Sequence, residues 1–204
     1  MQIGNFAKQN NLFIITDEIY EYFLYEDAKH ISPASFSEIK ENVITISGYS
    51  KTFSITGWRI GYIVCSKDIA KDIGYVHDLL YVCAPAPLQV GVAKGISNLP
   101  DSFYENLKLA YKFKRDIICE SLDKAGLTPI IPRGAYYVLA DISRLDGETG
   151  KNKVMNFLSK TKIAIVPGEA FYHDNAGDNI ARVCFAKDDL VLKKVAEILN
   201  SFKV

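Results

Sequence analysis

Residues 47–62 read S-G-Y-S-K-T-F-S-I-T-G-W-R-I-G-Y and contain one lysine, Lys51, and one arginine, Arg59. The small residues on both sides of Lys51 would let a flat ring approach the backbone closely. A fixed guanidinium nearby suits a phosphate group, which it can hold through two parallel hydrogen bonds. Taken alone, however, a lysine in a turn after a strand is usually a solvated side chain. The rest of the chain must therefore support any functional interpretation.

Apolar runs typical of strands lie on either side of this stretch. Residues 12–15 (L-F-I-I) form a continuous apolar run, as expected of a strand that is buried on both faces of a parallel sheet. We expect further strands at 43–47 and 59–65, with a helix-like segment around Glu21 between the first two. Open α/β sheets bind their ligands at the carboxyl ends of strands. Asp17 and Lys51 both follow such ends, which predicts one shared ligand site.

The second half of the chain shows a different pattern. Helices are predicted at 67–81 and 88–96, and a long helix is predicted from Asp101 to Gly126. The remaining segments are expected to be strands at 127–131, 135–142, 163–166 and 180–185, and helices at 152–160 and 190–202. We therefore expect two domains, with residues 1–99 in an α/β sheet domain and residues 100–204 in a small α+β domain.

Composition narrows the class of protein. Lys plus Arg and Asp plus Glu each number 24, so no net charge favours nucleic acid or an anionic membrane as a partner. No apolar run approaches the about 20 residues of a membrane helix, and the first residues lack a signal-peptide pattern. The four cysteines and three histidines are scattered without metal-ligand spacing, and we expect the histidines to be surface or packing residues. These features predict a cytoplasmic protein without a metal.

Within residues 47–62, the elements G-Y-S-K, S-I, G and R-I-G fill the constrained positions of a known signature. They resemble the pyridoxal-phosphate attachment segment of class I/II aminotransferases, the aspartate aminotransferase-like family. The resemblance extends from about Asn10 to Val204. It implies a fold-type-I transferase, an α/β fold with part of the large-domain sheet and a small C-terminal α+β domain. Because the sequence begins partway through the family's large domain, we expect roughly the first half of the usual enzyme to be absent.

The resemblance implies pyridoxal 5'-phosphate as the cofactor and assigns residues to it. Lys51 would carry the cofactor as a Schiff base and would later move the substrate's proton. The segment D-E-I-Y resembles the family segment whose aspartate, here Asp17, holds the proton on the pyridine nitrogen and keeps the ring an electron sink. Tyr20 would hydrogen-bond the ring oxygen. Arg59 would hold the phosphate, with Ser50 as a further contact through its hydroxyl.

The resemblance also assigns a substrate residue. Arg182, within A-R-V-C-F-A, matches the small-domain arginine that binds the substrate's α-carboxylate. A planar guanidinium suits a carboxylate, and holding it would orient the Cα–H bond for cleavage. For Glu18 and Tyr22 we expect structural roles.

These residues together predict an aminotransferase (transaminase) that exchanges an amino group between an amino acid and a 2-oxo acid. In its full-length form we expect a homodimer. The isolated chain would provide one wall of the pocket and is therefore expected to be inactive. Two alternatives stay open, namely a pyridoxal-phosphate-dependent lyase with the same residues and a non-catalytic aminotransferase-like module. Loss of the cofactor's absorbance on adding an amino acid would favour an enzyme over the module.

Overall fold

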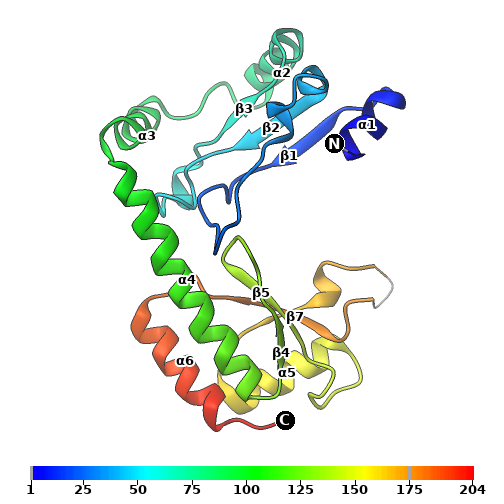
Figure 1. Ribbon diagram of the computed structural model, residues 1–204, viewed down its shortest axis with the longest axis vertical. Helices are drawn as coiled ribbons and strands as arrows, with labels where there is room; N and C mark the ends of the chain where they lie inside the picture. Colours follow the sequence, from blue (N-terminus) through cyan, green and yellow to red (C-terminus); the bar gives the residue numbers. More distant parts are fainter. Residues whose placement is uncertain (1, 174–175) are drawn as a thin grey trace. The chain divides into compact units, whose positions relative to one another are not determined.

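The computed structural model describes residues 2–173 and 176–204 and shows two compact units (Figure 1). Unit 1 comprises Met1–Tyr22 and Lys29–Tyr104, and unit 2 comprises Phe23–Ala28 and Glu105–Val204. Each unit has its own sheet. No helix in the described part of the chain has the length and apolar character needed to cross a membrane.

Unit 1 contains a three-stranded sheet in the order β1-β2-β3. Strand β1 (Ile14–Asp17) runs parallel to β2 (Val43–Ser47), and β2 runs antiparallel to β3 (Tyr62–Val64). The register places Asp17 beside Ile46. The parallel pair is the crossover arrangement that the sequence predicts. Residues 48–61, which carry Lys51 and Arg59, connect β2 to the antiparallel β3 without a crossover helix.

Several helical segments flank this sheet. They are α1 (Gln2–Gln9), η1 (Pro33–Ser35), η2 (Lys40–Asn42), η3 (Thr56–Trp58), α2 (Lys67–Leu80) and α3 (Ala86–Asn98). The prediction of a helix-like segment around Glu21 is wrong. The backbone there forms turns, with Glu21 N donating to Glu18 O at 3.1 Å, and the chain then leaves to join unit 2.

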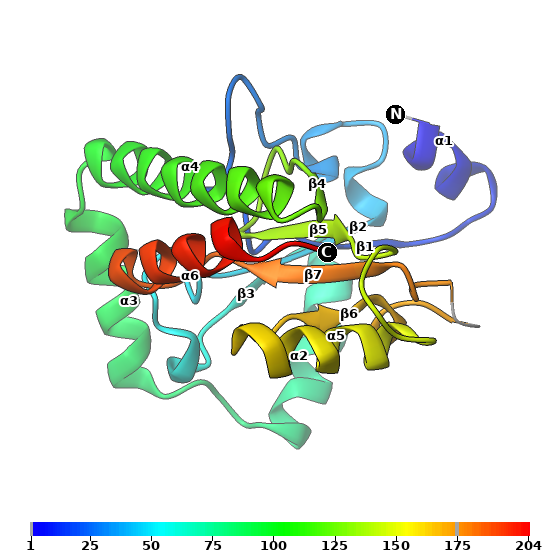
Figure 2. The ribbon, with the colours of Figure 1, turned by 90° about the horizontal axis from the view of Figure 1, so that it is seen from below.

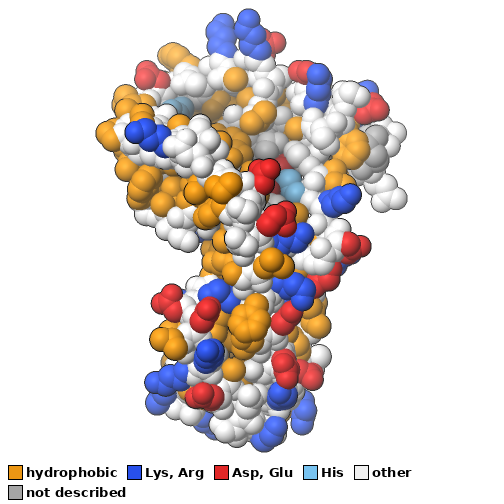
Figure 3. Space-filling view, turned by 60° about the vertical axis from the view of Figure 1, so that its left-hand side comes forward, with side chains coloured by type: hydrophobic (Ala, Val, Ile, Leu, Met, Phe, Trp, Pro, Cys, Tyr) orange, Lys and Arg blue, Asp and Glu red, His pale blue; other side chains and the backbone are white. Residues whose placement is uncertain are grey.

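The prediction that the first strand is buried on both faces is also wrong for the described structure. Phe13 and Ile15 are 61% and 67% exposed, and helix α2 has no buried residue. Strands of a parallel sheet are buried where helices cover both faces, and one side of β1 lacks such cover here. Figure 3 shows hydrophobic side chains gathered on the surface of unit 1.

Unit 2 is an α+β unit with a four-stranded antiparallel sheet in the order β4-β5-β7-β6. The strands are β4 (Thr128–Ile130), β5 (Tyr137–Asp141), β6 (Val166–Pro167) and β7 (Ile180–Cys184). The helical segments are α4 (Asp101–Lys124), which belongs to unit 2 from Glu105 on, α5 (Gly150–Thr161), η4 (Gly168–Ala170) and α6 (Asp189–Ser201) (Figure 2). Fully or almost fully buried side chains such as Ile118, Val138, Phe157, Phe185 and Leu199 form its core.

The segment Phe23–Ala28 belongs to unit 2 although β1 and β2 flank it in the sequence. Ala135 N donates to Phe23 O at 2.9 Å, which joins the segment to the loop before β5. Arg115 is only 4% exposed and makes two hydrogen bonds to the Glu26 carboxylate, at 2.6 and 2.9 Å. These bonds outweigh the cost of burying the guanidinium and raise the pKa of Arg115. Main-chain bonds and the ion pairs of Glu26 and Asp27 therefore hold this segment to unit 2.

Candidate active site

A cavity of about 300 Å³ lies in unit 1, where β1 and β2 end. The residues that line it are Asp17, Ile19, Ile46, Ser47, Ser50, Lys51, Arg59, Ile60 and Gly61. The structure therefore brings together four of the residues singled out from the sequence, with an amine, a carboxylate, a guanidinium and a hydroxyl around one space. Its volume is at the lower end of the range for small-molecule pockets.

The loop that carries Lys51 closes through a near contact between two glycines. A Cβ on Gly48 would lie 2.9 Å from Gly61 Cα and 3.0 Å from Ile60 O, so no larger residue fits without movement of the backbone. Within the loop, Phe53 N donates to Tyr49 O at 2.9 Å and Ile55 N donates to Ser50 O at 3.0 Å. These turns place the half-buried Lys51 at the cavity.

Arg59 has a backbone conformation that is uncommon for a residue other than glycine. Its φ is 56°, in the left-handed region, where strain is typical of functional sites. Its Nη1 donates to Thr56 O at 2.9 Å, which uses one of the five guanidinium donors and fixes the side chain beside the cavity. The buried Ser50 is held in the same region, because its Oγ donates to Ile60 O at 3.4 Å.

Asp17 occupies the last position of β1 and is exposed. Its Oδ1 accepts a hydrogen bond from Ile19 N at 3.2 Å, which turns the carboxylate at the strand end. Tyr20 follows three residues later in a turn and is half-buried, but it is not among the residues that line the cavity. Its contact with the ring oxygen of a cofactor stays a prediction.

Two residues beside this site have more specific surroundings than the sequence indicated. Glu18 is buried, and its Oε2 lies 2.6 Å from His30 Nε2. Tyr22 packs on Tyr104 and Tyr49, with ring centroids 4.6 and 6.1 Å away, and burial raises its pKa. The one sequence signal for Glu18 is strand alternation, which places it on the side opposite Asp17. No pattern in the sequence pairs it with a histidine twelve positions away.

Arg182 lies in unit 2 and is described there by itself. It is half-buried on β7, and its guanidinium carbon lies 4.3 Å from the ring centroids of both Tyr137 and Phe171. Cation–π contacts of this kind fix the plane of the guanidinium. Among residues 2–173 and 176–204, no acidic side chain forms an ion pair with Arg182. Its N–H donors are therefore suited to an anionic ligand.

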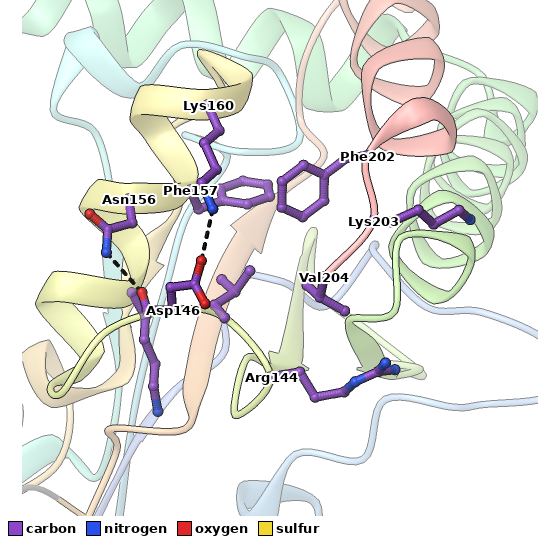
Figure 4. Close-up of a pocket in the computed structure, with 10 residues that line it drawn as sticks. Arg144, Asp146, Asn156, Phe157, Lys160, Phe202, Lys203 and Val204 are labelled. Carbon is purple, nitrogen blue, oxygen red and sulfur yellow. Dashed lines mark hydrogen bonds and ion pairs between the residues drawn. The ribbon is translucent and has the colours of Figure 1, made fainter.

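A second, smaller cavity lies in unit 2, between α5 and the C-terminal residues (Figure 4). Its volume is about 50 Å³, which is room for water but not for a cofactor. Two of its charged groups are paired with each other, since Lys160 Nζ donates to the Asp146 carboxylate at 2.8 Å. The rings of Phe157 and Phe202 meet edge to face at 5.4 Å. This cavity therefore belongs to the packing of unit 2.

Comparisons with known proteins identify the family of the chain. The family described as aminotransferase class I and II matches residues 1–199. A probable aspartate/prephenate aminotransferase of Aquifex aeolicus is 39% identical over 176 residues, which cover 83% of this chain and 44% of the relative. The human kynurenine–oxoglutarate transaminase 1 is 31% identical, over 99% of this chain and 53% of the relative.

The fold agrees as well. The crystal structure of an aromatic aminotransferase from Pyrococcus horikoshii superposes with a TM-score of 0.88 at 31% identity, over 98% of this chain and 52% of that structure. The chain spans about half the length of the curated relatives that it matches. By sequence and by fold, the chain belongs to the class I and II aminotransferase family.

Proposed function

We propose that this chain carries cofactor-binding and substrate-binding residues of a pyridoxal-phosphate-dependent aminotransferase. The observation that carries the proposal is the cavity at which Lys51, Asp17 and Arg59 meet. These groups and the Ser50 hydroxyl fit the cofactor, because an aldehyde, a ring nitrogen and a phosphate require an amine, a carboxylate and a guanidinium. The family match supports an aminotransferase independently of the geometry.

Bound pyridoxal phosphate would supply a ring that takes up the electrons of a broken bond at the substrate's Cα. Lys51 Nζ would attach the cofactor covalently and, once released, would move the proton at that Cα. The Asp17 carboxylate would hold a proton on the ring nitrogen. Arg59 and Ser50 would bind the phosphate, and Tyr20 would hydrogen-bond the ring oxygen.

Arg182 would bind the α-carboxylate of the substrate. The Tyr137 and Phe171 rings fix the plane of its guanidinium before the substrate arrives, so less conformational freedom is lost on binding. The substrates would be an amino acid and a 2-oxo acid, both of which present such a carboxylate. This common group explains how one arginine would serve both halves of an amino-group exchange.

The proposal also covers the whole protein. Residues 1–99 would belong to its large cofactor-binding domain and residues 100–204 would form its small domain. The full-length enzyme would be a cytoplasmic homodimer, and the isolated chain would be inactive. The free state of Cys65, Cys83, Cys119 and Cys184 supports a reducing compartment.

Titration with pyridoxal phosphate tests the proposal. The unaltered chain should develop the visible absorbance of a lysine-bound cofactor, and Lys51→Ala should abolish it. Lys67→Ala is the matched control, because Lys67 is an exposed lysine of the same unit that does not line the cavity. Equal absorbance in the unaltered chain and in Lys51→Ala would refute the assignment. In the full-length enzyme, loss of the absorbance on adding an amino acid would favour an enzyme over a non-catalytic module.

A further inference from the structure

A buried carboxylate that the proposed function does not use lies directly beside Asp17. Glu18 is 8% exposed, and a buried charge is costly unless hydrogen bonds compensate it. Four side chains surround it, with donor-to-carboxylate distances of 2.6 Å for His30 Nε2, 2.8 Å for Thr16 Oγ1, 2.8 Å for Ser32 Oγ and 3.4 Å for Thr45 Oγ1. These donors come from β1, from β2 and from the loop between them.

The backbone of Glu18 is tied to β2 at both of its polar groups. Glu18 N donates to Ile46 O at 2.8 Å, which continues the β1–β2 ladder past the strand end. Glu18 O accepts a hydrogen bond from Ser47 Oγ at 3.3 Å. Asp17 and Ile19, its two neighbours in the sequence, both line the cavity, whereas Glu18 does not. The alternation of side chains in an extended backbone thus places Asp17 and Glu18 on opposite sides.

Glu18 is held in its charged form. Burial alone would raise its pKa, but the hydrogen bonds from His30, Thr16 and Ser32 outweigh burial and lower the pKa. An ionised carboxylate with several donors is a rigid anchor, because leaving such a charge buried without its partners is strongly unfavourable.

Asp17 itself has a much weaker local support. Its carboxylate accepts a hydrogen bond from Ile19 N, two residues along the same backbone. The position of the Asp17 carboxylate therefore depends on the path of residues 17–19, and Glu18 is the residue that fixes this path.

We propose that Glu18 and His30 are positioning residues that hold the Asp17 carboxylate at the ring nitrogen of the cofactor. The link to the cofactor rests on the proposed function, whereas the link from His30 to the backbone at Asp17 does not. The pair touches no reacting atom and acts through Asp17.

The test compares five chains of 204 residues: the unaltered one, His30→Ala, His30→Gln, Glu18→Gln and Glu41→Gln. His30→Ala removes the 2.6 Å donor, and His30→Gln keeps a side-chain N–H at a similar place. Glu41→Gln is the control, because Glu41 is an exposed acid of unit 1 that pairs weakly with Lys40 at 4.0 Å. Glu18→Gln removes the charge of the buried side chain and keeps its shape.

Two readouts distinguish residues that position the Asp17 carboxylate from residues that only stabilise the fold. The first is amide hydrogen exchange over residues 17–20 without cofactor, which should become about tenfold faster in His30→Ala, since a charge-assisted hydrogen bond contributes about that factor. The second is the ¹⁵N chemical shift of the ring nitrogen of bound, labelled pyridoxal phosphate. It should move toward the unprotonated form in His30→Ala and Glu18→Gln. His30→Gln should restore both readouts, and Glu41→Gln should leave both unchanged.

Unchanged exchange in His30→Ala and Glu18→Gln would overturn the inference. Faster exchange with an unchanged ring-nitrogen shift would also overturn it, because the pair would then support the backbone alone. If the unaltered chain takes up no pyridoxal phosphate, the proposed function fails and the cofactor part of the inference fails with it. That failure is recognisable because it is common to every variant, whereas failure of the inference is specific to the His30 and Glu18 variants.

Discussion

Gly48→Ala should destabilise unit 1 because the Lys51 loop closes on this residue. The added Cβ would lie 2.9 Å from Gly61 Cα and 3.0 Å from Ile60 O, and both neighbours are backbone atoms that cannot rotate away. Overpacking of this kind costs about 1–3 kcal/mol of the free energy of unfolding. For a chain of this size, about 1 kcal/mol corresponds to a change in Tm of roughly 2–4 °C. We therefore expect Tm to fall by about 2–12 °C.

Gly74→Ala provides a matched control in the same unit. Gly74 lies in α2, and a Cβ there meets no atom of the described residues within 4 Å. Alanine in a helix interior is favoured over glycine by about 0.5–1 kcal/mol, so this variant should be slightly more stable than the unaltered chain. The two substitutions add the same methyl group with opposite expected signs.

The assay is thermal and urea unfolding followed by the fluorescence of Trp58, the one tryptophan of the sequence, which lies in unit 1 next to Arg59. A Gly48→Ala chain as stable as Gly74→Ala would refute the close approach of the two loop ends. Gly48→Ala should also reduce cofactor uptake, because relief of the clash moves the segment that carries Lys51.

Two further predictions concern unit 2. In the full-length enzyme, Arg182→Ala should raise KM for the amino acid by about 10- to 100-fold and affect kcat less. This factor corresponds to the binding free energy that a pair of charge-assisted hydrogen bonds contributes. Arg133→Ala, at an exposed arginine paired with Asp27, should leave KM unchanged, and equal effects of the two changes would contradict the assignment. The hydrogen bond to Arg115 lowers the pKa of Glu26, so this stabilisation is complete above about pH 4.3 and is lost as the pH falls through the lowered pKa. Amide exchange over residues 23–28, corrected for intrinsic rates, should accelerate as the pH falls below about 4.3, and protection that does not change with pH in this acidic range would contradict the prediction.

Local sequence patterns predicted the helices and strands whose bounds are set by their own residues and immediate neighbours. Strand β2 has the predicted bounds, and α2 ends one residue before its predicted end, because an apolar period and flanking polar residues define both. Strand β6 was predicted at 163–166 but is Val166–Pro167, since its length is set by how far it pairs with β7. Pairing across a sheet depends on distant residues and cannot be read from a local window.

The residues at the candidate site also fall into two groups, those that local sequence could predict and those that it could not. Asp17, Ser50, Lys51 and Arg59 could be found because strand ends and a compact signature place them, and the structure gathers them around one cavity. The environment of Glu18 could not be found, because its partner His30 lies in a loop whose path no periodicity describes. The contacts of Arg182 with the Tyr137 and Phe171 rings could not be predicted either, because these rings lie on other segments of the chain than Arg182.

The central claim is that one particular amine of the chain binds the cofactor covalently, and reductive trapping tests it most directly. The chain is incubated with pyridoxal phosphate and borohydride, which converts a lysine-bound aldehyde into a stable secondary amine, and the labelled peptides are identified by mass spectrometry. We predict that the label is concentrated on Lys51 and is lost in Lys51→Ala. Label spread evenly over the surface lysines would contradict the account.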